Sequence, residues 1–193
     1  MSFESAHNYS DYQRYLEIKH HLQIRYRNIS MVDACAIDFI EAIVLHRETD
    51  WYHVGCALLQ RIWIKPLREA FETSKNVFTY AIARRKDHEA LSHAIAESVE
   101  DSQWINLKFV YRPYKSFVRW MRFWHHVHAI PISFVNRAFI AARMAGYSCV
   151  IDDLEKNFKT INLKGKCYIP FNAPSFQETL LTLYFNTKGV RTY

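Results

Sequence analysis

Apolar residues recur along most of the chain at the spacing of helices rather than of strands. Within residues 9–100 they return every three or four positions, which places them on one face of a helix. Ser30, Thr49 and Asp87 stand where such segments begin and are good first residues for a helix. Pro66 is expected to kink a helix or to divide it. We therefore expect helices over residues 9–27, 31–45, 50–74 and 87–100.

A helix with one cationic face is expected over residues 114–128. Pro113 fits at its start, because the missing amide hydrogen of proline is not needed in a first turn. One side of this helix carries apolar residues at three- and four-residue spacing, namely Phe117, Trp120, Met121 and Trp124. Another side carries Lys115, Arg119, Arg122 and His126. The helix should therefore turn an apolar face inward and a cationic face outward.

A second helix should follow over residues 133–146. Ser133 is a good N-cap, apolar residues repeat at helical spacing, and Gly146 is the kind of residue that commonly ends a helix. The residues after this glycine are typical of a strand, so we expect a strand over residues 148–151.

The C-terminal part should contain a lysine-bearing hairpin and a last helix. The hairpin is expected to pair residues 158–162 with residues 166–171. Ser175 and Glu178 have the spacing of a capping box, which predicts a helix over residues 175–185. The expected fold class is mainly α, with an N-terminal helical bundle over residues 1–101 and a basic α+β region over residues 102–193.

Charge differs sharply between these two halves. Residues 1–101 hold 12 Lys and Arg against 15 Asp and Glu, a balance of −3, whereas residues 102–193 hold 13 against 4, a balance of +9. The two balances add up to the net charge of +6. A basic half of this kind attracts polyanions, so we expect a nucleic-acid partner. The alternative is an acidic protein, or the acidic half of a second copy in a homodimer.

Other features of the sequence predict a cytoplasmic protein without a membrane partner. The N-terminus lacks a basic segment followed by an apolar one, and no uncharged apolar run reaches the 18 residues of a membrane span. The four cysteines stand apart from one another, as free thiols in a reducing compartment do. His53 with Cys56, and the three histidines within residues 125–128, lack the spacing of zinc ligands. We therefore expect no metal and no cofactor.

The segment from residue 114 to residue 171 resembles the winged helix-turn-helix superfamily of DNA-binding proteins. The resemblance rests on the sequence Ser-Phe-Val-Asn-Arg-Ala at residues 133–138, on Gly146, and on the lysine-bearing hairpin that should follow. In addition, residues 167–170, Cys-Tyr-Ile-Pro, resemble an edge found in plasmid replication initiators. The superfamily places the second helix in the major groove and the hairpin, or wing, on the phosphate backbone.

This resemblance implies a non-enzymatic regulatory or accessory protein that binds nucleic acid, with double-stranded DNA favoured. Asn136 and Arg137 would then read base edges, because amide and guanidinium groups pair bidentately with purines. The remaining basic residues would contact phosphates, namely Lys115, Arg119, Arg122, Arg143, Lys159, Lys164 and Lys166. Residues 1–101 would serve dimerisation or bind a partner.

Two other classes of function remain open at this point. The protein is alternatively an interaction factor, such as an inhibitor or adaptor encoded by a mobile element, that uses its basic aromatic surface to bind a protein. A second alternative is a ribonuclease of the HEPN type, whose motif has four to six residues between an arginine and a following histidine. Arg119 with His125, and Arg122 with His128, match that pattern, in which arginine would stabilise the charge that develops on phosphorus.

Overall fold

The chain folds into two compact units that are both discontinuous in sequence. A computed structural model describes residues 3–64, 75–80, 86–105, 107, 109–113, 117–170 and 175–192. Unit 1 comprises residues 1–62 and 111–149, and unit 2 comprises residues 63–110 and 150–193. The expected boundary near residue 101 does not separate these units, because the chain passes from unit 1 to unit 2 and back before it returns to unit 2.

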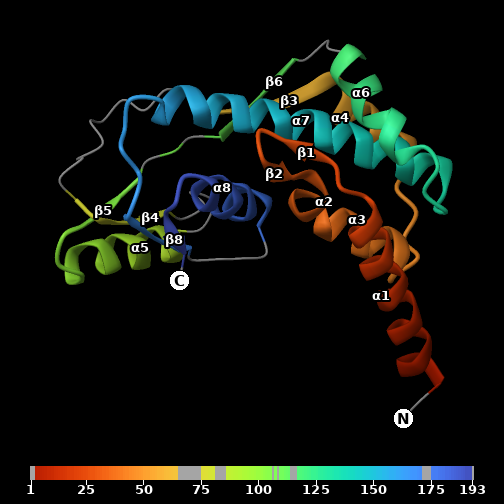
Figure 1. The fold of residues 1–193 in the computed structure, drawn as a ribbon, viewed down its shortest axis with the longest axis horizontal. Coiled ribbons are helices and arrows are strands. Elements are labelled where there is room, and N and C mark those ends of the chain that lie inside the picture. The colour runs from red at the N-terminus through yellow and green to blue at the C-terminus, as the bar shows by residue number, and fades with distance from the viewer. Residues whose placement is uncertain are drawn as a thin grey trace. The chain divides into compact units, whose positions relative to one another are not determined.

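Helices dominate unit 1, and Figure 1 shows its elements. It contains α1 (Phe3–His21), β1 (Arg25–Tyr26), β2 (Ile29–Ser30), α2 (Met31–Ala34), α3 (Ala36–Ile43), α4 (Trp51–Leu59) and α6 (Phe117–Val127). Three elements contribute residues to both units, namely β3 (Gln60–Ile64), β6 (Phe109–Pro113) and α7 (Phe134–Phe158). The strands β3 and β6 pair with each other in a two-stranded sheet.

The N-terminal helices overlap the expected ranges, but α1 begins at Phe3 and the helix expected over residues 31–45 is divided into α2 and α3. Ser30 caps α2 as expected, since its hydroxyl accepts a hydrogen bond from the Asp33 amide at 3.2 Å. The first helix, however, already ends at His21. Arg27 and Asn28 have φ angles of 47° and 66°, which is the left-handed geometry of a two-residue turn between β1 and β2.

The helix expected over residues 50–74 was wrong at residues 60–64. Asp50 rather than Thr49 is its N-cap, and α4 ends at Leu59. Gln60–Ile64 is the strand β3, in which Ile62 and Ile64 are both buried. Apolar residues at alternate positions suit a strand, and here this two-residue spacing, rather than the helical spacing, determines the secondary structure. Residues 65–74, which include Pro66, lie outside the described residues.

The expected end of a helix at Gly146 was also wrong. Ser133 does begin the helix, because its hydroxyl accepts a hydrogen bond from the Asn136 amide at 3.2 Å. The helix α7 then continues through Gly146 to Phe158, so residues 148–151 are helical and not a strand. Met144, Tyr147 and Val150 are all buried. Burial on nearly every side of α7 outweighs the roughly 1 kcal/mol that a glycine costs inside a helix.

Unit 2 contains a parallel sheet where the sequence predicted a hairpin. Its elements are β4 (Val77–Tyr80), α5 (Lys86–Ser98), β5 (Ser102–Trp104), β7 (Cys167–Pro170), α8 (Phe176–Thr187) and β8 (Arg191–Thr192). The strand order is β5-β4-β7-β8, and each neighbouring pair is parallel. The strand β7 thus pairs with β4 and β8, while residues 159–162 are not a strand. The described residues therefore contain no wing, and this part of the expectation is corrected.

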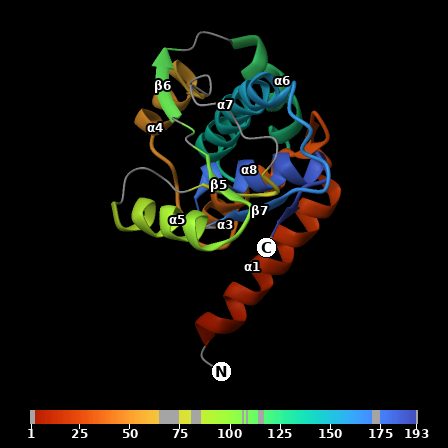
Figure 2. The same cartoon turned by 90° about the vertical axis from the view of Figure 1, so that its left-hand side faces the viewer.

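Helices α5 and α8 cover opposite faces of that sheet. Phe78 of β4 contacts Phe185 of α8, with ring centroids 4.9 Å apart. Thr79, the next residue of β4, lies on the other face and is paired with Trp104 of β5. The ring of Trp104 packs against that of His93 on α5, with the ring centroids 4.3 Å apart. A parallel sheet with helices on both faces is a mixed α/β architecture, drawn from a second side in Figure 2.

Two further expectations for the helices of unit 2 are confirmed. The helix α5 agrees with the expected residues 87–100 to within two positions. Ser175 caps α8 by accepting a hydrogen bond from the Glu178 amide at 3.2 Å, as the capping box predicts. Among the helices that the structure describes, none has both the length and the apolar content needed to cross a membrane.

Candidate functional site

Asn136 holds a loop of unit 1 in place instead of facing solvent. Only 5 % of its surface is exposed. Its side-chain amide nitrogen donates to the carbonyl of Arg47 at 2.9 Å, and its side-chain oxygen accepts from the amide of Thr49 at 2.9 Å. The donor and the acceptor of this side chain are therefore both used inside the protein, and base reading by Asn136 stays a prediction.

Two arginines that the sequence assigned to nucleic acid also contact the protein itself. Arg137 donates to the carbonyl of His128 at 2.5 Å, in the loop that precedes α7. The guanidinium of Arg119 reaches α7 and contacts the hydroxyl of Ser148 at 3.1 Å and the sulfur of Cys149 at 3.3 Å. These contacts fasten α6 and the start of α7 to the rest of unit 1.

The other predicted phosphate contacts fall into both units. Arg122 is exposed on α6, and its guanidinium lies 5.6 Å from the centre of the Tyr26 ring. In unit 2, Lys159 and Lys164 are exposed, whereas Lys166 is buried and donates to the carbonyl of Lys75. Lys115 lies outside the described residues. Nucleic-acid binding stays a prediction.

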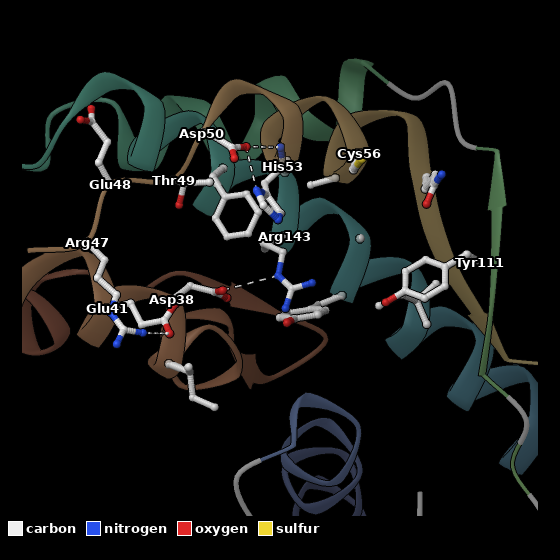
Figure 3. Close-up of a pocket in the computed structure, with 18 residues that line it drawn as sticks. Asp38, Glu41, Arg47, Glu48, Thr49, Asp50, His53, Cys56, Tyr111 and Arg143 are labelled. Carbon is white, nitrogen blue, oxygen red and sulfur yellow. Dashed lines mark hydrogen bonds and ion pairs between the residues drawn. The ribbon is translucent and has the colours of Figure 1, made fainter. Parts of the chain in front are cut away.

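Unit 1 contains a cavity of about 660 Å³ that the sequence did not indicate. Figure 3 shows its walls: α3 supplies Asp38 and Glu41, the loop after α3 supplies Arg47, and α4 supplies His53. The helix α7 contributes Arg143, and β6 contributes Tyr111. A cavity of a few hundred cubic ångströms with converging polar groups is the usual form of a small-molecule site.

A partly buried ion pair lies in this cavity. Asp38 Oδ1 is 3.5 Å from Arg143 Nε, and the two side chains are 10 % and 26 % exposed. The guanidinium of Arg143 lies 4.9 Å from the ring centre of Tyr147 and 5.6 Å from that of Phe139, which are four residues away on either side along α7. Burial raises the pKa of the Asp38 carboxyl, and the charge of Arg143 opposes that rise. Such a perturbed carboxyl beside a cavity is typical of a functional site.

The opposite wall carries a second pair, at the start of α4. Asp50 Oδ1 accepts from the backbone amide of His53 at 2.8 Å and lies 2.7 Å from Nδ1 of the same residue. The backbone hydrogen bond and then the side-chain one lower the pKa of Asp50. Because Nδ1 of His53 is occupied, the orientation of its ring is fixed within the site.

The ion pair of Arg47 with Glu41, and the carboxylate of Glu48, form the edge of the cavity. Arg47 and Glu41 are 3.3 Å apart, with both side chains substantially exposed. Glu48 is exposed next to them. Asn136 forms hydrogen bonds with the backbone of residues 47 and 49. These two hydrogen bonds thus support the edge of the cavity and hold it in place.

The cavity has an excess of negative charge and several aromatic side chains. Four carboxylates line it against two guanidinium groups, which leaves a formal charge of −2 when His53 is neutral. The carboxylates are Asp38, Glu41, Glu48 and Asp50, and the aromatic residues are Tyr111, Phe139 and Tyr147. Cys56 also lines the cavity and is half-buried. Within the described ranges, no three His, Cys, Asp or Glu side chains are arranged to hold a metal ion.

Sequence reasoning missed this site because its residues come from four separate segments. Asp38 was given no role in the sequence analysis, and Arg143 was assigned to a phosphate contact. One local signal was available for Arg143, since Phe139 and Tyr147 flank it at four-residue spacing on the same helix face. Asp38 carries no comparable signal.

Comparison of the chain with protein-family models, with curated proteins and with solved structures finds no match.

Proposed function

We propose that the cavity of unit 1 binds a small organic cation that carries more than one protonated amine. The observation that carries this proposal is the set of four carboxylates against two guanidinium groups around a cavity of about 660 Å³. Charges of one sign around a concave surface concentrate ions of the opposite sign. The excess of carboxylates therefore favours a cation over a phosphate or a carboxylate ligand.

The aromatic lining favours an organic cation in particular. Tyr111 presents an exposed ring at one end of the cavity, and Phe139 and Tyr147 flank Arg143 on α7. Ammonium groups are attracted to the faces of aromatic rings as well as to carboxylates. The methylene segments of a polyamine also pack against rings and against small apolar residues such as Ala142.

The spacing of the carboxylates supports an extended ligand rather than a metal ion. Asp38 and Glu41 lie on α3, while Asp50 lies at the start of α4, on the other wall in Figure 3. A calcium or magnesium ion needs several oxygen ligands within about 2.0–2.6 Å of one point. Two or three amines separated by short methylene chains can instead pair with carboxylates on different walls.

Isothermal titration calorimetry with spermidine tests the proposal, with citrate and glucose as anionic and neutral comparisons. We expect saturable binding of spermidine, weaker binding of the diamine putrescine, and none of citrate. Glu48→Gln removes an exposed charge and should weaken spermidine binding by about two- to fivefold, as for one exposed ion pair. Glu17→Gln on α1 is the matched control, because Glu17 is also exposed but does not line the cavity. Equal effects of the two variants, or binding of citrate in place of spermidine, would refute the proposal.

A further inference from the structure

Helix α6 exposes large apolar side chains on its outer surface. Phe117, Val118 and Met121 are 67 %, 81 % and 41 % exposed. They lie at positions i, i+1 and i+4, so they share one side of the helix, which we call the α6 face. Phe123 and Val127 of the same helix are buried in unit 1 and fix α6 to it. An apolar cluster held outward in this way is typical of an interaction surface.

A series of aromatic rings continues this surface beyond α6. Phe117 contacts Trp120 with ring centroids 5.3 Å apart, and Trp120 stacks on Trp124 at 5.3 Å. Trp124 contacts Phe134 at 5.2 Å, and Phe134 contacts Trp51 at 6.0 Å. Phe134 and Trp51 are more than half exposed. Tryptophan rings of this kind are favoured where water meets lipid.

The charges beside the α6 face are positive. Arg122, His125 and His126 are exposed on α6. In the sequence, residues 102–151 contain seven Lys and Arg and no Asp or Glu. An apolar surface next to cationic side chains is complementary to a lipid surface with anionic headgroups.

We propose that the α6 face docks onto the surface of an anionic phospholipid membrane. Val118 and Met121 would enter the boundary between headgroups and acyl chains, while Arg122 would remain among the headgroups. The helix would lie on the membrane rather than cross it, which agrees with the absence of a spanning helix among those described. This proposal departs from the sequence-based expectation that the protein has no membrane partner.

A lipid surface fits these side chains better than a nucleic acid does. Bases bind aromatic faces, but Val118 and Met121 have no ring on which a base could stack. Trp120 and Trp124 already stack on each other with an angle of 18° between their planes. Arg119 and Arg137 are engaged with the protein, which leaves fewer cations for phosphates. The more exposed side chains are therefore suited to burial in lipid.

Flotation with vesicles of phosphatidylglycerol and phosphatidylcholine tests this proposal. We expect binding that rises with the share of phosphatidylglycerol and falls with salt, together with a blue shift of tryptophan fluorescence. The double variant Val118→Ser/Met121→Ser should weaken binding at least about tenfold, because it removes two apolar insertions. Leu59→Ser on α4 is the matched control, since Leu59 is 65 % exposed but is not on α6.

The same variants distinguish lipid from nucleic acid. Single-stranded and duplex DNA are added to the protein in parallel, with quenching of tryptophan fluorescence as the measurement. Failure to float with anionic vesicles would overturn the proposal. So would DNA binding that Arg122→Gln weakens and the double variant leaves unchanged, because the surface would then bind nucleic acid. The variant positions are exposed, and circular dichroism verifies that each variant is folded.

Discussion

The carboxylate of Asp38 on α3 lies 3.5 Å from the guanidinium of Arg143 on α7, in the cavity of unit 1. The two residues are far apart in sequence, and neither had been expected to contact the other. Phe139 and Tyr147 flank the guanidinium, so the pair is largely shielded from water. An ion pair shielded in this way has to be complete, because either charge alone would be costly to bury.

Removal of one partner of this pair should destabilise unit 1. We expect Arg143→Met to lower the free energy of unfolding by about 3 kcal/mol, the usual cost of leaving a buried charge unpaired. Urea denaturation monitored by circular dichroism measures the change. The double variant Asp38→Asn/Arg143→Met restores neutrality and should recover part of the loss. If Arg143→Met costs no more than Arg122→Met, whose side chain is exposed, the pair does not have the expected role.

Asp38 and Asp50 should titrate on opposite sides of the ordinary aspartate pKa of 3.8. Burial raises the pKa of Asp38, whereas hydrogen bonds from His53 lower that of Asp50. Carbon-detected NMR of the side-chain carboxyls measures both values directly. Spermidine should lower the pKa of Asp38, because a bound cation favours the ionised form. Overlapping titrations of the two residues would contradict this assignment.

The raised pKa of Asp38 has a defined consequence for stability. The folded protein holds the proton of Asp38 more tightly than the unfolded chain does. Asp38 therefore contributes fully to the stability of the folded protein below the pKa that it has in the unfolded chain. This contribution is lost as pH rises from about 4 through the pKa of Asp38 in the folded protein. Denaturation of the wild type and of Asp38→Asn across this window should show the falling contribution in the wild type alone. If the contribution of Asp38 to stability rises with pH instead, the pKa of Asp38 is not raised in the folded protein.

Asn136→Ala distinguishes support of the cavity from direct reading of DNA. The variant removes hydrogen bonds to Arg47 and Thr49, and we expect it to cost about 1–3 kcal/mol of stability. It should also weaken spermidine binding, because the edge at residues 47–49 loses its support. Calorimetry and denaturation on the same sample give both values. Unchanged stability together with altered DNA sequence preference would instead favour the base-reading role.

Ligand binding should protect one cysteine and leave another unaffected. Cys56 lines the cavity and is half-buried, while Cys167 is half-buried in unit 2. We expect both to react with a maleimide, whereas Cys35 and Cys149 are buried and should not react in the folded protein. Burial also raises the pKa of the Cys35 thiol well above its ordinary value, which reduces thiolate at neutral pH. Spermidine should slow labelling of Cys56 only, as followed by mass spectrometry, and equal slowing at Cys167 would indicate a nonspecific effect.

Local signals in the sequence predicted several elements of the fold correctly. Ser30, Ser133 and Ser175 each cap the expected helix, because a serine hydroxyl satisfies an amide in the first turn whatever the surroundings. The helix does not end at Gly146, because burial around α7 outweighs the low helix propensity of glycine. No local pattern in the sequence reveals this burial. The parallel sheet was missed because β4 and β7 are brought together by contacts across nearly ninety residues.

The candidate site was harder to predict for a related physical reason. The same residue types suit both DNA binding and support of the cavity, since an arginine or asparagine on a helix binds DNA when exposed and stabilises the protein when buried. Arg143 and Asn136 were assigned to nucleic acid because residues 133–146 resemble the recognition helix of a winged helix-turn-helix. Their burial depends on α3 and on the loop after it, which pack against α7 from another part of the chain.

Two-dimensional NMR during titration with spermidine shows at each backbone amide whether the ligand binds in the cavity of unit 1. We expect saturable shifts of the backbone amides of Asp38, His53 and Arg143, which lie on three walls of the cavity. The amides of Lys159 and Thr179 in unit 2 should not shift. Shifts that do not saturate, or that spread over both units without a maximum around the cavity, would contradict a polyamine site in unit 1.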